Sequence, residues 1–306
     1  MNTNRREFLR DISRLGGGAL TMGRLALTGA SARGIEPFVR PAGAKFKFSL
    51  AAYSYRQLLT DPTSGYTLND FVDDCAKMGL DGTELTSYYF PESVTPDYVR
   101  SLKAHCFRQG LDVSGTAIAN DFCYPPGNDR DAQLAHVRSW VDHAETLGAP
   151  VIRVFSGKPR DGQDDAEARR LAIAGMEEAC VYAGEHGVYL GLENHGGLST
   201  HAEDLLSIVR DVKSPWFGVN LDTGNFHSAD PYADIALLAP YAVNVQVKVS
   251  IHPDGGSRQP ADFRRLASIL RDSDYRGYVA LEYEEEEDAR EACPRYVDEL
   301  RDAFLG

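Results

Sequence analysis

The feature that most constrains the fold of this chain is a regular alternation of short strand-like runs with longer helical segments. Eight runs are rich in β-branched and other apolar residues, and the segments between them place apolar residues at helical spacing. The runs cover residues 46–53, 82–86, 111–118, 151–155, 188–193, 217–222, 243–247 and 278–282. The helical segments cover residues 68–78, 97–108, 132–147, 166–185, 202–212 and 263–271. Strands that alternate with helices form a parallel sheet, so the pattern predicts an α/β fold.

The size of the repeated region distinguishes between the two common α/β architectures. Eight units in about 260 residues match a (β/α)8 TIM barrel, which typically has about 250. A doubly wound sheet normally carries a glycine-rich turn after its first strand, and the sequence contains neither GxGxxG nor GxxxxGK[ST]. Four helical segments are followed by a glycine suited to a left-handed C-cap: Gly79, Gly110, Gly148 and Gly187. We therefore predict a (β/α)8 TIM barrel over residues 45–306.

The start of the chain is expected to lie outside this fold. Residues 5–9 read Arg-Arg-Glu-Phe-Leu and resemble the core of the twin-arginine export signal. A weakly apolar, glycine-rich stretch follows at 16–30, and Ala-Ser-Ala at 30–32 offers a small-x-small cleavage site. We predict a signal peptide over 1–32, a linker over 33–44 and a periplasmic or secreted mature protein. A basic amphipathic helix or a cytosolic tail is the alternative interpretation.

Composition excludes several classes of function. With 45 acidic against 32 basic residues the net charge is −13, and an acidic surface repels phosphate backbones, so we expect no nucleic-acid partner. No charge-free apolar run is long enough for a transmembrane helix, so we expect no membrane span in the mature protein. The five cysteines are scattered and form no CxxC pair, which disfavours a disulfide framework and a zinc site. The sequence leaves open whether the chain forms a homo-oligomer.

Polar residues close several of the predicted strands, and the active sites of such barrels lie at these ends. The residues concerned are Glu84, Arg153, Glu193, His195, Asp222, Asn225, Gln246, Lys248 and Glu282. Carboxylates that lose solvation at a barrel mouth need a cation or hydrogen-bond donors. A divalent metal satisfies that need, and oxygen ligands favour Mn²⁺ or Mg²⁺ over zinc. Salt bridges from the carboxylates to Arg153 and Lys248 are the alternative.

The strand-end series resembles the xylose isomerase-like barrels of the sugar phosphate isomerase/epimerase superfamily, also called the AP endonuclease 2-like domain. In that family one metal is held by a Glu, an Asp, a His and a Glu on strands five to eight. The resemblance implies Glu193, Asp222 and Glu282 as ligands of one divalent ion, with Mn²⁺ first and Mg²⁺ second. Gln246 stands at the histidine position, where an amide oxygen binds more weakly than imidazole. A satisfied interior amide is the alternative interpretation of Gln246.

The resemblance also implies an activity. In the family's epimerases two metal-bound glutamates exchange a proton next to a sugar carbonyl through an enediolate, and these catalytic roles fall on Glu193 and Glu282. We therefore expect a metal-dependent isomerase or epimerase of a non-phosphorylated keto-sugar, because phosphosugars are chiefly cytosolic. A lyase that acts on an oxidised (3-keto) glycoside is an alternative. A non-catalytic periplasmic sugar-binding barrel is a second alternative, and a phosphodiesterase-like AP endonuclease is disfavoured by the acidic surface.

Further polar residues near the strand ends are candidates for contact with the sugar. They are His195, Lys248, Arg153, Asn225 and His227. His227 follows Asp222-Thr-Gly-Asn225, where the family has Asp-Thr-x-His, and so comes two residues late. A loop-capping role is the alternative for His195. Neutralisation of the carboxylates is the alternative for Lys248 and Arg153.

Overall fold

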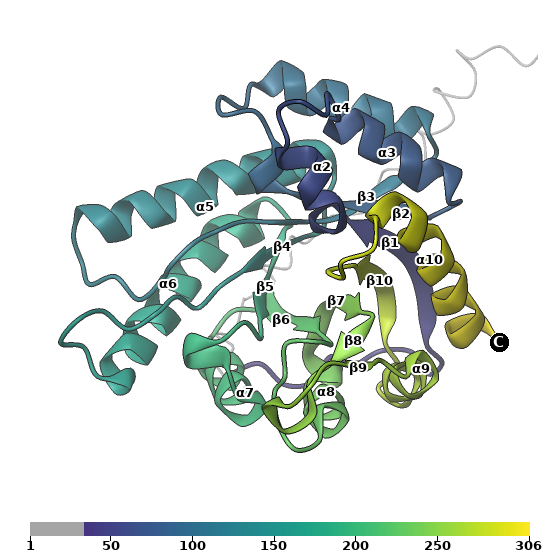
Figure 1. The fold of residues 1–306 in the computed structure, drawn as a ribbon. Helices are drawn as coiled ribbons and strands as arrows, with labels where there is room; N and C mark the ends of the chain where they lie inside the picture. The colour runs from purple at the N-terminus through teal and green to yellow at the C-terminus, as the bar shows by residue number, and fades with distance from the viewer. Residues whose placement is uncertain (1–33) are drawn as a thin grey trace, which may run out of the picture. The chain divides into compact units, whose positions relative to one another are not determined.

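The strands form a closed parallel barrel in the computed structural model, which describes residues 34–306. The eight barrel strands are β1 (Lys45–Ala51), β2 (Gly82–Thr86), β3 (Asp112–Ala117), β4 (Val151–Val154), β5 (Tyr189–Glu193), β6 (Phe217–Asp222), β7 (Ala242–Lys248) and β10 (Arg276–Glu282). Neighbouring strands pair in parallel, and β1 closes the barrel against β10. Helices surround the strands (Figure 1). The predicted (β/α)8 TIM barrel is confirmed.

The α-helices that cover the barrel follow the predicted order. They are α2 (Arg56–Thr60), α3 (Leu68–Lys77), α4 (Pro96–Arg108), α5 (Asn128–Leu147), α6 (Asp165–Glu185), α7 (Ala202–Asp211), α8 (Pro231–Leu238), α9 (Phe263–Asp272) and α10 (Ala289–Leu305). Helices α2, α8 and α10 are not among the predicted helical segments. The short α2 buries none of its residues, α8 is apolar around most of its circumference, and α10 carries Pro294, a residue that is unfavourable in a helix interior.

Short elements complete the connections between strands and helices. The 3₁₀ turns are η1 (Ala52–Tyr55), η2 (Ser87–Tyr89), η3 (Gly197–Ser199), η4 (Ala239–Tyr241) and η5 (Pro253–Gly255). A two-stranded hairpin, β8 (Ser250–Ile251) with β9 (Gln259–Pro260), lies in the connection after β7. Within residues 34–306 the structure has no helix long and apolar enough to cross a membrane.

Local sequence signals explain the helix boundaries. The side chain of Thr95 accepts a hydrogen bond from the backbone of Tyr98 and caps α4, whose first residue is Pro96. The glycines predicted after α3, α4, α5 and α6 have φ angles of 64°, 76°, 80° and 69°. These values lie in the left-handed region that other residues avoid. The predicted C-cap glycines are confirmed.

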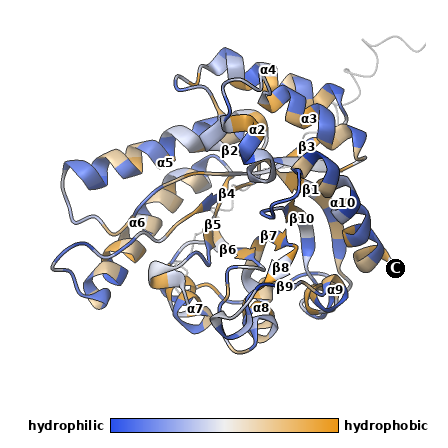
Figure 2. Cartoon of the chain, viewed as in Figure 1, coloured by the Kyte–Doolittle hydropathy of each residue, from blue (hydrophilic) through white to orange (hydrophobic). Residues whose placement is uncertain are grey.

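The longer helices turn an apolar face towards the barrel and a polar face outwards, as α3 shows (Figure 2). In α3 the apolar residues Leu68, Phe71, Val72 and Cys75 are buried, whereas the residues on its other side are largely exposed. Packing of such faces against the strands forms the main hydrophobic core of the described chain.

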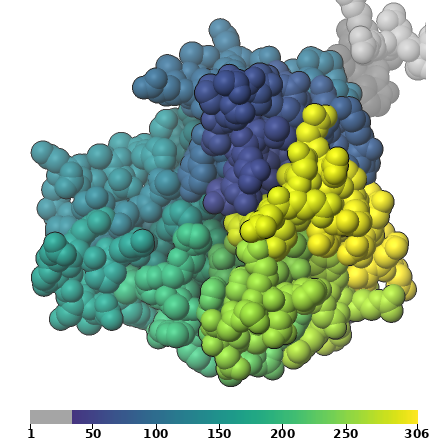
Figure 3. Space-filling model, in the orientation of Figure 1, coloured from purple at the N-terminus to yellow at the C-terminus, as the bar shows by residue number. Residues whose placement is uncertain are grey.

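The two ends of the barrel domain meet beside the β1–β10 seam. Arg56, in α2, donates through Nη1 to the carbonyl oxygen of Tyr283 at 2.9 Å, just after β10. Figure 3 shows the segment after β1 lying side by side with α10 on the surface. The early and late parts of the chain therefore close the barrel jointly.

The segment before β1 is attached to the barrel. The backbone N–H of Phe38 donates to the carbonyl oxygen of Pro240 at 3.0 Å, and Arg40 donates to the carbonyl oxygen of Ala242. The predicted linker, of which the structure describes residues 34–44, thus packs against the start of β7. The predicted signal peptide, residues 1–32, lies outside the described residues.

Candidate active site

Four ionisable side chains end neighbouring strands at one mouth of the barrel. Glu193 is the last residue of β5, Asp222 of β6, Lys248 of β7 and Glu282 of β10. All four side chains are buried. Because the strands are parallel, their carboxyl ends meet at the same end of the barrel. The structure therefore places three of the four predicted metal ligands at the same end of the barrel.

Glu193 is held by a cation and an amide. Its Oε2 lies 2.8 Å from Nε of Arg153, and its Oε1 accepts a hydrogen bond of 2.9 Å from Nδ2 of Asn225. Nδ1 of His195 lies 3.3 Å from the same Oε1. Burial opposes the ionisation of Glu193, but Arg153, with His195 and Lys248, outweighs it and lowers the pKa of Glu193. Glu193 is thus a carboxylate.

Arg153 is positioned from several sides. Its Nη1 donates to the carbonyl oxygen of Ile118 at 2.8 Å, and its guanidinium lies over the ring of Phe155, 4.1 Å from the centroid. The side chain is nearly inaccessible to solvent. Arg153 therefore orients Glu193, and its remaining N–H groups face the hydroxyl of Tyr88 at 3.4 Å.

Lys248 lies among the other carboxylates. Its Nζ is 3.3 Å from Oδ2 of Asp222, 3.6 Å from Oε2 of Glu282 and 3.0 Å from Oε2 of Glu284. It also donates to Oδ1 of Asn225 at 3.0 Å. Burial lowers the pKa of Lys248, but the surrounding carboxylates outweigh it and raise that pKa above its usual value. The amine is therefore protonated at neutral pH.

One lysine does not compensate fully for the buried acids. Burial raises the pKa of Asp222, and Lys248 only partly opposes the effect. Burial likewise raises the pKa of Glu282 well above its usual range, with Asp222 and Glu193 adding repulsion. Two glutamates at one mouth thus differ in proton affinity, because Glu193 has a strong cationic partner and Glu282 does not.

Gln246 lies deeper and belongs to a network of interior amides. Its amide nitrogen donates to Oε1 of Glu84 at 2.5 Å, and its oxygen accepts from Asn220 at 2.6 Å. Asn244 donates to Glu84 at 2.7 Å and to Asn220 at 2.8 Å. Both ends of the Gln246 amide are engaged, as in the interior-amide interpretation. Ligation by Gln246 stays a prediction.

The predicted sugar contacts separate into two groups. His195, Arg153, Asn225 and Lys248 all touch the carboxylates or one another. His227 is exposed and stacks on His252 of the connection after β7, with 4.7 Å between the ring centroids. The structure therefore places His227 beside a loop histidine rather than in the carboxylate cluster.

Some residues of the site were missed from the sequence. Glu284 contacts Lys248 but belongs to the acidic run 284–288, which resembles a solvated loop. Asn220 and Asn244 precede Asp222 and Gln246 by two positions, and so share their faces of β6 and β7. That period of two was the signal that could have found both asparagines.

The chemistry of the donors suits a divalent cation. Glu193, Asp222, Glu282 and Glu284 carry four negative charges when ionised, whereas Arg153 and Lys248 supply two positive ones, so two negative charges remain. Oδ2 of Asp222 is buried without a hydrogen-bond partner. In the part of the chain that the structure describes, no three His, Cys, Asp or Glu side chains are grouped closely enough to hold a metal ion. The residues fit a hard divalent ion in type and charge, but they are not grouped as a metal site, and Lys248 lies between Asp222 and Glu282, two of the predicted ligands.

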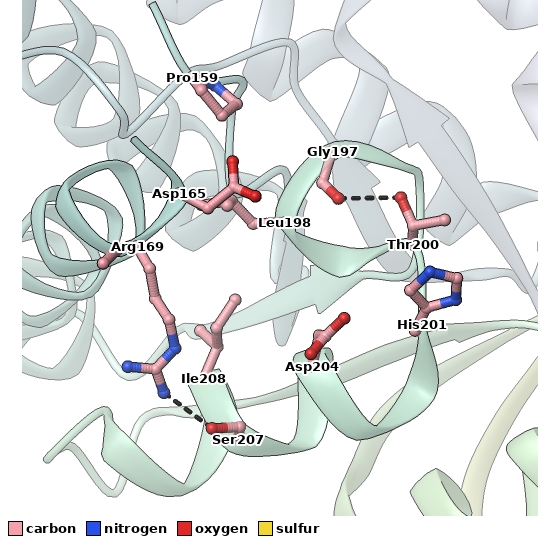
Figure 4. A pocket seen from close by; sticks show the side chains of 11 residues that line it. Pro159, Asp165, Arg169, Gly197, Leu198, Thr200, His201, Asp204, Ser207 and Ile208 are labelled. Carbon is pink, nitrogen blue, oxygen red and sulfur yellow. Dashed lines mark hydrogen bonds between the residues drawn. The ribbon is translucent and has the colours of Figure 1, made fainter. Parts of the chain in front are cut away.

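Two pockets adjoin the connections after β4 and β5. One of about 270 Å³ is lined by residues that include Asn120, Phe155, Lys158, Ser199 and His195, and the last of these contacts Glu193. The other, of about 450 Å³, lies between α6 and α7 (Figure 4). Arg169 lines this second pocket and is bound to Ser207 and Asp211. The pocket that contains His195 is the better candidate for a substrate.

The fold and its polar mouth define a (β/α)8 barrel with an acidic site at the ends of β5, β6, β7 and β10. The chain belongs to the xylose isomerase-like TIM barrel family, whose model matches residues 72–300. A comparison with curated protein sequences found no match.

Solved structures with the same fold include sugar epimerases. D-psicose 3-epimerase from Clostridium cellulolyticum H10 with D-tagatose superposes with a TM-score of 0.71 at 16% identity, covering 84% of this chain and 99% of the other. For an L-ribulose 3-epimerase the TM-score is 0.66 at 16% identity, with 85% and 96% covered. For the probable 3-DHS dehydratase AsbF from Bacillus anthracis it is 0.64 at 18% identity, with 83% and 98% covered. At these identities the likeness shows the fold.

Proposed function

We propose that this protein is an isomerase or epimerase that moves a proton next to the carbonyl of a non-phosphorylated sugar. The observation that carries the proposal is the pair of buried glutamates at one mouth, with the pKa of Glu193 lowered and that of Glu282 raised. Such a pair supplies a base and an acid at the same pH. Membership of the xylose isomerase-like family and the epimerases among the structural neighbours support this assignment.

The ionised Glu193 is the group that accepts the proton from the carbon beside the carbonyl. Arg153 and Asn225 fix the direction of its carboxylate, so little reorganisation is needed before transfer. Glu282, at the end of β10, is the second group of the pair and returns a proton to the sugar. His195, Lys248, Arg153 and Asn225 supply hydrogen bonds to the sugar hydroxyls, and the pocket beside His195 accommodates the rest of the substrate.

We also propose that the site binds a divalent cation, Mn²⁺ in preference to Mg²⁺. Glu193, Asp222 and Glu282 would hold it, with Gln246 as a fourth ligand once its oxygen is free. When bound, the cation polarises the carbonyl and stabilises negative charge on oxygen.

Removal of the cation should abolish turnover. Residues 33–306, purified and loaded with Mn²⁺, should hold about one ion per chain and convert a free ketose into its epimer or aldose. Dialysis against a chelator should stop this reaction and lower the melting temperature, because a ligand bound only to the native state stabilises it. The substrate panel includes free ketoses, their phosphates and a 3-keto glycoside. Undiminished turnover by fully metal-free protein would refute the metal requirement.

A lyase acting on an oxidised glycoside is the second candidate. The observation that favours it is the raised pKa of Glu282, because a protonated acid there can equally protonate the oxygen that leaves after Glu193 removes a proton. Release of an aglycone from the 3-keto glycoside, without epimerisation of free ketoses, would select this candidate. Binding of sugars without any turnover would select the non-catalytic barrel.

We also propose that the protein is exported by the twin-arginine route. The Arg5-Arg6 pair and the cleavage site at residues 30–32 support this. Replacing both arginines with lysine should leave the full-length precursor in the cytoplasm, as measured by cell fractionation. The matched control replaces Arg10 and Arg14 with lysine, which keeps the pair. Normal export of the variant that lacks the arginine pair would exclude this route.

A further inference from the structure

We propose that the ammonium group of Lys248 is an internal cation that a divalent metal must displace, and that Glu284 receives it. The inference rests on the proposed metal requirement of the site. It concerns how this chain controls entry of the ion.

Lys248 lies between Asp222 and Glu282, two of the residues that would hold the metal. Its Nζ is 3.3 Å from Oδ2 of Asp222 and 3.6 Å from Oε2 of Glu282, two carboxylates on different strands. Asn225 and Glu284 provide further oxygens at 3.0 Å. A shell made of oxygen atoms from carboxylates and an amide is the kind that a hard cation prefers. The ammonium and a divalent ion therefore compete for the same ligands, and their like charges repel each other.

The geometry confines any movement of Lys248 to the end of its side chain. Its backbone N–H donates to Oγ1 of Thr223 at 3.0 Å, and its Cα pairs in register with that of Glu282 on β10. The aliphatic stem passes over Gly224, where a Cβ would lie only 2.7 Å from Cδ of Lys248. The backbone is thus fixed, whereas Nζ can exchange partners by rotation of the terminal bonds.

Glu284 is the partner that remains when Lys248 leaves the metal ligands. It follows β10 by two residues, and its side chain is 29% exposed, whereas those of Asp222 and Glu282 are 0% and 8% exposed. Its Oε2 is already the nearest carboxylate oxygen to Nζ. A shift towards Glu284 therefore keeps Lys248 paired and frees two buried carboxylates. The neighbouring Glu285 is bound to Ser250 and Arg258 and is not available to Lys248.

Titration with Mn²⁺ alone tests this exchange, with free Mn²⁺ followed by electron paramagnetic resonance. Lys248→Met should bind Mn²⁺ about 10-fold or more tightly than wild type, within the usual range for coupling between two bound charges. Lys213→Met removes the same charge from an exposed position before β6 and should leave the affinity unchanged. Glu284→Gln should weaken binding, whereas Glu285→Gln should have a smaller effect.

The double variant that combines Lys248→Met with Glu284→Gln distinguishes an exchange of partners by Lys248 from a simple effect of charge. If Glu284 acts by receiving Lys248, Glu284→Gln should weaken Mn²⁺ binding in wild type but barely change it in Lys248→Met. Equal effects in both backgrounds would overturn the role of Glu284. Unchanged or weaker binding by Lys248→Met would overturn the displacement while leaving the proposed function intact. If Lys248→Met does not fold, unchanged or tighter binding by Glu284→Gln overturns the proposal. Absence of Mn²⁺ binding in every variant would instead refute the metal requirement itself.

Discussion

The single variants Glu193→Gln and Glu282→Gln should each have a kcat about 10²–10⁴-fold lower than wild type, because this is the usual contribution of a general acid or base. Both variants keep an amide oxygen in place of a carboxylate oxygen, so metal content should fall less than activity. The loss is large because both glutamates are buried at the mouth, where water has little access to substitute for them. The measurement is turnover of the ketose that wild type accepts, beside the Mn²⁺ content of each variant.

The control for these two variants is Glu285→Gln. Glu285 follows β10, as Glu284 does, but it is bound to Ser250 and Arg258 and does not join the carboxylate cluster. This variant should retain most of the wild-type rate. Full activity in Glu193→Gln or Glu282→Gln with metal retained would show that the residue concerned is only a structural ligand.

Replacing Arg153 with Leu should reduce the free energy of unfolding by about 3–5 kcal/mol at pH 7, because it leaves the buried carboxylate of Glu193 without its cation. Urea unfolding of the metal-free protein measures the loss. Arg169→Leu is the control, since its ion pair with Asp211 is partly exposed to solvent and should contribute only about 0–1 kcal/mol.

The loss caused by Arg153→Leu should depend on pH. In wild type the lowered pKa of Glu193 contributes stability above the unfolded value of about 4.3, and that contribution fades as the pH falls. Without Arg153, burial raises the pKa of Glu193, so the variant is penalised most at neutral pH. The difference in unfolding free energy between the two proteins should therefore narrow as the pH approaches 4. A difference no larger than that of Arg169→Leu, or one that widens in acid, would contradict the assigned ion pair.

The ends of the strands were predictable because they depend on local order in the sequence. Glu193, Asp222 and Glu282 each end an apolar run. Parallel strands place their carboxyl ends at the same end of the barrel, irrespective of the conformation of the loops. The C-cap glycines followed from the same local logic, because a helix that stops before a strand often ends at a residue with positive φ.

The partners of these side chains were only partly predictable, because they depend on distances across the barrel. The orientation of Gln246 is set by Glu84, 162 positions earlier in the chain, and by Asn220 on the neighbouring strand. The contact of Lys248 with Glu284 depends on how the connection after β10 turns back over the mouth, and a run of acids carries no signal of that turn. The sequence therefore predicted which carboxylates gather at the mouth and offered Arg153 and Lys248 as their salt-bridge partners, but it did not predict the contact of Lys248 with Glu284.

Nuclear magnetic resonance of a free ketose incubated with the Mn²⁺-loaded protein in D₂O is the most direct test of proton transfer by Glu193 and Glu282. We expect deuterium to enter at the carbon next to the carbonyl while the epimer or aldose forms. We also expect both processes to slow together in Glu193→Gln, which lacks the proposed base. Formation of product without any deuterium at that carbon, or exchange at an unchanged rate in Glu193→Gln, would contradict proton transfer by this pair of glutamates.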